Sequence, residues 1–157
     1  MKIFYLDEDP YKAALWLDDV RQNKMILETA QLLCTAWNIL EPDHGMPLYK
    51  STHINHPCAV WVRESADNCE WLLDYWFYLA EIRNFSHKSF TDLWKYLVFG
   101  PPSSLNYKGL TLHPNCTTFK EEKDTVIAYR KYMCYEKWGH RTTWNYGEEP
   151  EWRKEYV

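Results

Sequence analysis

Hydrophobic positions in the first quarter of the chain recur at the spacing of helices rather than strands. In the stretch that ends near residue 39 they follow the three- to four-residue recurrence of a helix face, with one gap of six residues and one adjacent pair: Val20, Ile26, Leu27, Ala30, Leu33 and Trp37. Asp9 followed by Pro10 is typical of a helix start, because aspartate caps a helix and proline suits its first position. The pattern predicts a short helix over about 10–15, a bend, and a long helix from residue 18 or 19 to 39.

A second stretch, residues 57–83, is apolar on nearly all sides and begins at a proline. All-round hydrophobicity is typical of a buried helix, so we expect one long central helix here. The other segments are predicted to be helices over 90–99 and 121–138, loops over 41–47 and 100–119, and an irregular aromatic tail over 139–157. Strand signals are nearly absent. The sequence therefore predicts an all-α fold, with residues 1–157 forming a compact single-domain helical bundle.

Charge and composition limit the classes of function. The chain carries 18 Lys and Arg against 22 Asp and Glu, a net charge of −4, which argues against coating nucleic acid by bulk charge but permits a local basic groove. No apolar run reaches the roughly 18 residues of a membrane-spanning helix, and the start has no apolar signal segment. Five cysteines without a CxxC pair indicate reduced thiols. We expect a cytoplasmic protein with no membrane partner, and make no prediction of its oligomeric state.

The chain is rich in aromatic residues, with nine Trp and twelve Tyr. Most are expected in the core, but rings interleaved with cations can also stack on bases while the cations bind phosphates. Arg130 and Tyr132 form one such group, and Arg141, Trp144 and Tyr146 form another. The alternative is a helix face and a tail that clamps the fold.

A polar stripe follows the first long helix by helical spacing: Asp18, Arg21, Lys24, Glu28, Gln31 and Thr35. It predicts either a solvated face with a Lys24–Glu28 pair or an acid–base site that lines a cleft. In the second case a carboxylate flanked by cations can stabilise a cationic sugar-like transition state. A desolvated Lys24 can form a Schiff base.

Polar residues also gather just before the predicted helix at Pro57. His53, Asn55 and His56 lie where free backbone N–H groups suit a phosphate, although Asn55 or His56 can equally cap the helix. A metal set of His53 and His56 with Cys58 or His87 lacks the regular zinc spacings, so no metal is expected.

Arg63 and Asn68, with Glu64, form a polar patch on the apolar stretch. Buried charges are costly without partners, so these residues indicate either a structural partner on the first long helix or a ligand.

Three blocks, 17–33, 55–61 and 141–147, together resemble the bacteriophage pyrimidine-dimer DNA glycosylase (endonuclease V) superfamily, which includes small uncharacterised phage and bacterial members. The resemblance runs through most of the chain in order, and the first two blocks are its specific part. It implies a compact helical domain for DNA repair, without a cofactor. It also implies an N-glycosylase with abasic-site lyase activity on damaged or modified pyrimidine nucleotides, acting through an imine between an N-terminal α-amine and the sugar.

The resemblance implies roles for individual residues. Glu28 corresponds to the catalytic carboxylate, Met1 carries the α-amine, and Lys24 or Lys2 is an alternative nucleophile. The expected sugar-phosphate and pocket contacts are Arg21, Gln31, His53, Asn55, His56, Arg63, Asn68 and Arg130. The expected contacts to bases or the displaced strand are Tyr132, Trp144 and Tyr146.

The chain departs from the family pattern at three points. Lys2 replaces the small second residue, Leu27 replaces an arginine beside the glutamate, and the chain is acidic. Two alternatives therefore stand beside the enzyme. One is a non-catalytic phage protein that binds a nucleotide or nucleotide-like signal, for example against host defence. The other is a structural or interaction protein.

Overall fold

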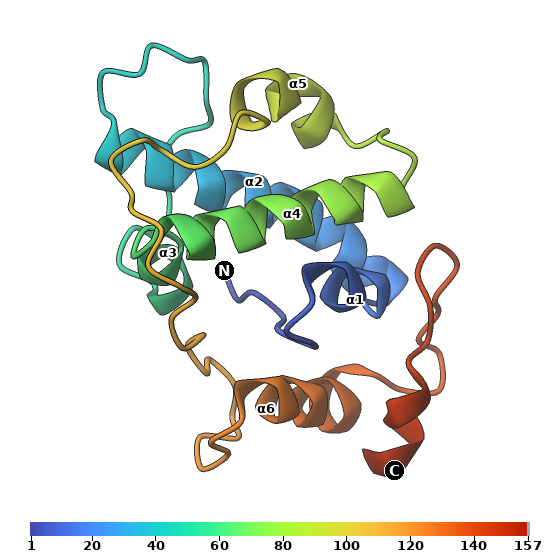
Figure 1. Ribbon diagram of the computed structural model, residues 1–157. Helices are drawn as coiled ribbons and strands as arrows, with labels where there is room; N and C mark the ends of the chain where they lie inside the picture. Colours follow the sequence, from blue (N-terminus) through green and yellow to red (C-terminus); the bar gives the residue numbers. More distant parts are fainter. Residues whose placement is uncertain (157) are drawn as a thin grey trace.

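The computed structural model describes residues 1–156, and in that part all regular elements are helices, which confirms the predicted all-α class (Figure 1). The α-helices are α1 Pro10–Leu15, α2 Asp19–Leu40, α3 Pro57–Val62, α4 Ala66–Ile82, α5 Lys88–Leu97 and α6 Thr125–Tyr132. A π-helical turn, η1 Met133–Lys137, continues α6, and a 3-10 helix, η2 Glu151–Tyr156, lies in the tail. No described helix combines the length and apolar character needed to cross a membrane.

Each α-helix begins at a polar residue whose side chain accepts a hydrogen bond from a backbone N–H of the first turn. These residues are Asp9, Asp18, His56, Ser65, His87 and Asp124. Such a cap satisfies a donor that has no partner within the helix and stabilises it by about 1 kcal/mol. The starts predicted at Asp9 and Asp18 are confirmed.

The prediction of one long helix over 57–83 is wrong. The chain leaves the helical path after α3, and Ser65 begins α4 by accepting the backbone N–H of Asn68 at 3.1 Å. The apolar run is continuous through both helices, so hydrophobic pattern alone does not show the break. The predicted helix over 121–138 also begins later, at Thr125, because Asp124 caps it.

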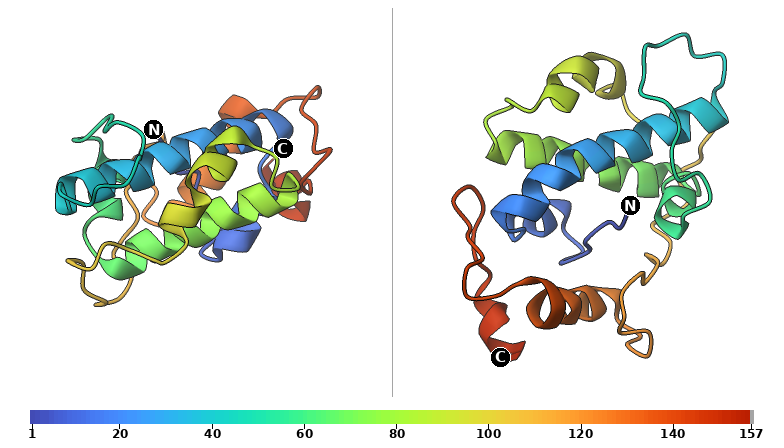
Figure 2. Two further views of the ribbon diagram at one scale, coloured as in Figure 1. Left: turned by 90° about the horizontal axis from the view of Figure 1, so that it is seen from above. Right: turned by 180° about the vertical axis from the view of Figure 1, so that it is seen from behind.

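Helices α2 and α4 lie side by side at the centre of the molecule, as Figures 1 and 2 show from different sides. The indole N–H of the fully buried Trp76 on α4 donates to the carbonyl oxygen of Ile26 on α2 at 3.1 Å. Helix α1 packs against α4, and α5 packs against α2. One cluster of buried side chains joins these helices to the N-terminal segment and to α6.

The N-terminal segment, residues 1–6, runs without regular structure between α2 and α6 (Figure 2). Ile3 and Leu6 are fully buried, and Arg130 of α6 donates to the Leu6 carbonyl oxygen at 2.8 Å. These contacts fix the path of the segment and bring the α-amino group of Met1 against the polar stripe of α2.

Candidate functional site

The α-amino group of Met1 lies beside the carboxylate of Glu28. The nitrogen is 3.7 Å from Oε1, and Lys24 Nζ is 3.6 Å from Oε2 on the same carboxylate. The Met1 and Glu28 side chains are only 3% and 14% exposed, whereas the Lys24 side chain is 63% exposed. The carboxylate therefore lies between the α-amine of a residue whose side chain is buried and the solvated ammonium of Lys24.

These groups line a pocket of about 190 Å³, which we call the amine pocket. Its lining residues come from the N-terminal segment, from α2 and from the α6–η1 region: Met1, Lys2, Phe4, Val20, Arg21, Lys24, Glu28, Tyr132 and Lys137. Glu28 is its only carboxylate, among four lysine or arginine side chains. Such an excess of cations attracts anionic ligands.

Two buried oxygens near the amine pocket lack hydrogen-bond partners among the described residues. They are Oε2 of Glu28 and the hydroxyl of Tyr75. Burial, and after it the charge of Glu28, raises the pKa of Tyr75, so this hydroxyl is neutral. Unsatisfied buried polar groups are rare and are a common feature of ligand and catalytic sites.

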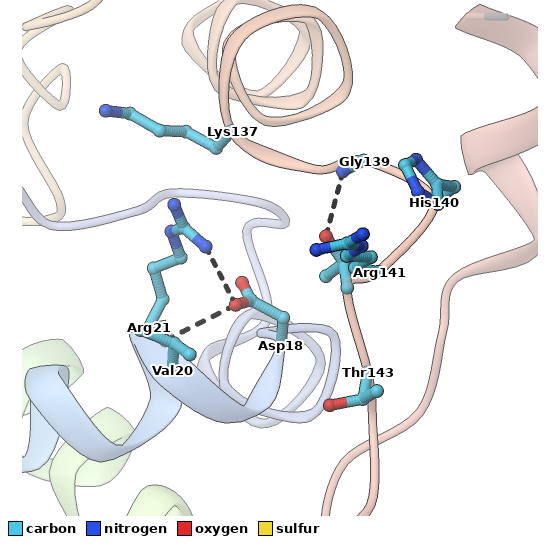
Figure 3. Close-up of a pocket in the computed structure, with 9 residues that line it drawn as sticks. Asp18, Val20, Arg21, Lys137, Gly139, His140, Arg141 and Thr143 are labelled. Carbon is cyan, nitrogen blue, oxygen red and sulfur yellow. Dashed lines mark hydrogen bonds and ion pairs between the residues drawn. The ribbon is translucent and has the colours of Figure 1, made fainter.

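A second pocket of about 350 Å³ continues from the first, and we call it the loop pocket (Figure 3). It shares Val20, Arg21 and Lys137 with the amine pocket, and its other lining residues are Asp18, Gly139, His140, Arg141, Thr142 and Thr143. Arg21 pairs with Asp18 at 3.0 Å. The two pockets together present five lysine or arginine side chains against two carboxylates, so this surface is basic although the chain is acidic.

Asp19 holds the C-terminal loop that carries the loop pocket. Its carboxylate accepts from Thr143 Oγ1 at 2.6 Å and from Asn145 Nδ2 and N at 2.7 and 2.8 Å. Its backbone N–H donates to the Thr143 carbonyl oxygen at 3.0 Å. Although burial raises it, these hydrogen bonds bring the pKa of Asp19 below its ordinary value. The loop is therefore fixed against the first turn of α2.

Two residues of the predicted binding set make contacts that stabilise the fold. Asn68 is fully buried, and its side chain bonds to the carbonyl oxygen of Trp61 and to both the hydroxyl and the backbone N–H of Thr111. The guanidinium of Arg63 donates to the Ala59 carbonyl oxygen at 3.3 Å. The described ion partners of Glu28 are Met1 and Lys24 and do not include Arg63.

Some residues of the two cation–aromatic groups make contacts that stabilise the fold, whereas others line a pocket or are exposed. Arg130 pairs with Asp7 at 3.0 Å and stacks on the ring of Trp152. The Trp144 indole N–H donates to the Trp16 carbonyl oxygen at 2.9 Å, as expected of a tail that clamps the fold. Tyr132 instead lines the amine pocket, and Tyr146 is exposed with the guanidinium of Arg83 3.9 Å from its ring centre.

Several predicted contacts lie outside both pockets. Gln31 is half-buried, and its backbone carbonyl accepts from Thr35 Oγ1 at 2.7 Å. His53 and Asn55 are exposed in the loop before α3. His56 is the residue that caps α3, with Nδ1 accepting the Cys58 N–H at 3.1 Å. Burial, and after it the charge of the Met1 amine, lowers the pKa of His56.

The sequence reasoning missed Lys137 and His140, which line the two pockets. Lys137 lies at the end of the π-helical turn, whose widened geometry has no signature in the apolar pattern. His140 directly precedes the 141–147 block of the resemblance. The block therefore indicated this loop but did not include His140.

Comparisons of the chain with protein-family models, with curated proteins and with solved structures find no match. The resemblance to pyrimidine-dimer glycosylases stays a prediction from the three sequence blocks, and the argument for function is made from the two pockets.

Proposed function

We propose that this protein is a DNA N-glycosylase with abasic-site lyase activity, and that the α-amine of Met1 is its nucleophile. The observation that carries the proposal is the pair of Met1 N and Glu28 Oε1, 3.7 Å apart in a pocket whose other charged side chains are all cations. An α-amine suits an imine mechanism because its ordinary pKa, about 7.7–8.0, leaves a usable neutral fraction near neutral pH.

Glu28 has two tasks in this reaction. Its carboxylate takes a proton from the Met1 ammonium, and the neutral amine then attacks C1′ of a sugar as the base departs. A carboxylate at this distance also stabilises the positive charge that develops on the sugar. The C1′–O4′ bond then breaks, O4′ takes a proton, and the C1′–N bond becomes an imine. The imine loses a proton from C2′, and the C3′–O bond to the 3′-phosphate breaks by elimination.

The basic lining of both pockets supplies phosphate contacts on either side of an extruded nucleotide. Arg21 and Lys137 belong to both pockets, Lys2 and Lys24 to the amine pocket, and Arg141 to the loop pocket. A local basic surface reconciles DNA binding with a net charge of −4. Extrusion costs a few kcal/mol and is least costly at a damaged base, which favours a damaged or modified base as the substrate. The choice of pyrimidines rests on the resemblance.

The test is nicking of ultraviolet-irradiated supercoiled plasmid, with unirradiated plasmid beside it. The wild-type protein nicks the irradiated plasmid, and Glu28→Gln lowers the rate by about 100-fold or more while DNA affinity changes little, because general acid–base groups contribute about that factor or more. Asp92→Asn is the matched control, since Asp92 also pairs with a lysine one helical turn away but lies on α5. A Glu28→Gln protein that nicks at the wild-type rate refutes the assignment.

A second candidate, a non-catalytic protein that binds a nucleotide or a small phosphorylated signal, is favoured by the size of the loop pocket. About 350 Å³ lined by Arg21, Lys137 and Arg141 can hold a phosphorylated ligand without any long basic track. This candidate predicts an ultraviolet-absorbing ligand released when the purified protein is denatured. It also predicts that Arg141→Ala abolishes retention of that ligand while Glu28→Gln does not.

A further inference from the structure

Three potential metal ligands from two distant parts of the chain come together beside α3. They are His56 at the N-cap of α3, Cys58 in its first turn, and Cys116 in the long loop between α5 and α6. One ligand atom from each lies within 4.8 Å of the others. Cys58 is buried, and His56 and Cys116 are half-buried, so the cluster is sheltered yet reachable from solvent.

The spacing suits a small tetrahedral ion. Zn–S bonds of about 2.3 Å and Zn–N bonds of about 2.0 Å hold tetrahedral ligands roughly 3.5–3.8 Å apart, so closing the cluster requires a contraction of about 1.3 Å at most. Side-chain rotation of the two cysteines supplies such a movement. Thiolate and imidazole ligands select zinc over magnesium or calcium, which prefer oxygen ligands.

The protonation of the cluster is also suited to a cation. His56 Nδ1 accepts the Cys58 N–H at 3.1 Å, so this nitrogen carries no proton and has a lone pair. A hydrogen bond with Cys58, and after it the charge of Lys120, lowers the pKa of Cys116, whereas the bond to Cys116 and burial raise the pKa of Cys58. A metal ion binds cysteine as thiolate, so metal binding here releases protons.

We infer that His56, Cys58 and Cys116 bind one divalent ion of the zinc class, with water in the fourth position. The ion ties the long loop that follows α5 to the start of α3. This site is separate from the proposed glycosylase reaction, since neither Glu28 nor the Met1 amine takes part in ligation, and its test does not use DNA.

The experiment is a titration of the reduced, chelator-treated protein with Co²⁺ and then Zn²⁺. We expect one equivalent of Co²⁺ to produce a sulfur-to-cobalt charge-transfer band in the near ultraviolet, and one equivalent of Zn²⁺ to remove it. His56→Asn removes the nitrogen ligand but keeps a residue that caps helices well. His56→Asn and Cys116→Ser should lose the band, and Cys134→Ser, at another half-buried free cysteine, should keep it.

A measurement on the wild-type chain keeps the test independent of how variants fold. Zn²⁺ should slow alkylation of Cys116 by at least tenfold, mapped by peptide mass spectrometry, and leave the alkylation of Cys134 unchanged. The inference is overturned if Co²⁺ gives no charge-transfer band, if Cys116→Ser keeps it, or if Zn²⁺ leaves the alkylation rate of Cys116 unchanged.

Discussion

Replacing His113 by phenylalanine should make the free energy of unfolding depend less on pH in the acidic range. His113 is 3% exposed, its ring stacks on Tyr5 with centroids 4.4 Å apart, and Nε2 lies 3.2 Å from the Ile3 carbonyl oxygen. Because that oxygen accepts, Nε2 carries the proton of the neutral ring, and Nδ1 has no hydrogen-bond partner among the described residues. Burial lowers the pKa of His113 to about 3, although the bond to Ile3 acts in the opposite direction.

The sign and size of the effect follow from the two pKa values. The unfolded chain binds a proton at this histidine below about pH 6.5, whereas the folded protein stays neutral there until about pH 3. The contribution to stability is therefore complete above pH ~6.5 and is lost progressively as the pH falls toward ~3. A pH of about 5 lies roughly 1.5 units below the ordinary pKa of histidine. Protonation there stabilises the unfolded state by about 2 kcal/mol relative to the folded state.

The assay is reversible urea unfolding of the wild type and His113→Phe at about pH 8 and about pH 5, analysed as a two-state transition. Phenylalanine keeps the stack on Tyr5 but loses the bond to Ile3, so we expect about 1 kcal/mol lower stability at the higher pH. The loss of stability between the two pH values should be about 2 kcal/mol smaller in the variant than in the wild type. His140→Gln, at an exposed histidine, is the control. Equal losses in wild type and His113→Phe would refute the reasoning.

Two further predictions concern the C-terminal loop. Gly147→Ala should destabilise the fold by about 3 kcal/mol, because a Cβ there collides with the backbone carbonyl oxygen of Leu15. Gly139→Ala should change stability by less than about 0.5 kcal/mol, because no atom lies within 4 Å of its new carbon. Thermal unfolding compares the two, and equal values would contradict the packing argument. Asp19→Ala should speed amide hydrogen exchange of residues 143–146 by about tenfold or more, because it removes the carboxylate that holds the loop. Unchanged protection there would show that other contacts fix the loop.

Local chemistry made part of the fold predictable. The starts at Asp9 and Asp18 follow from capping, which depends on residues within one helical turn. The Lys24–Glu28 pair follows from helical spacing in the same way. Ser65 was missed because its cap lies inside a continuous apolar run, and the hydrophobic pattern there describes burial rather than the path of the backbone.

The site depends on contacts between distant parts of the chain, which a helical pattern does not contain. The Met1 amine reaches Glu28 because Arg130 holds the Leu6 backbone, a contact that spans most of the sequence. Cys116 joins His56 and Cys58 through a loop that has no periodicity. Arg130, for which the sequence predicted a ligand contact, supports the segment that carries the amine.

The most direct test of the proposed chemistry is where a trapped DNA adduct forms. Borohydride is added to the protein with duplexes that carry an ultraviolet dimer, an abasic site or no lesion, and the adduct is mapped by peptide mass spectrometry. The account predicts an adduct on the dimer duplex at the α-nitrogen of Met1, lost in Glu28→Gln and in a protein extended before Met1. An adduct on Lys2 or Lys24, or none with the dimer duplex, would contradict it.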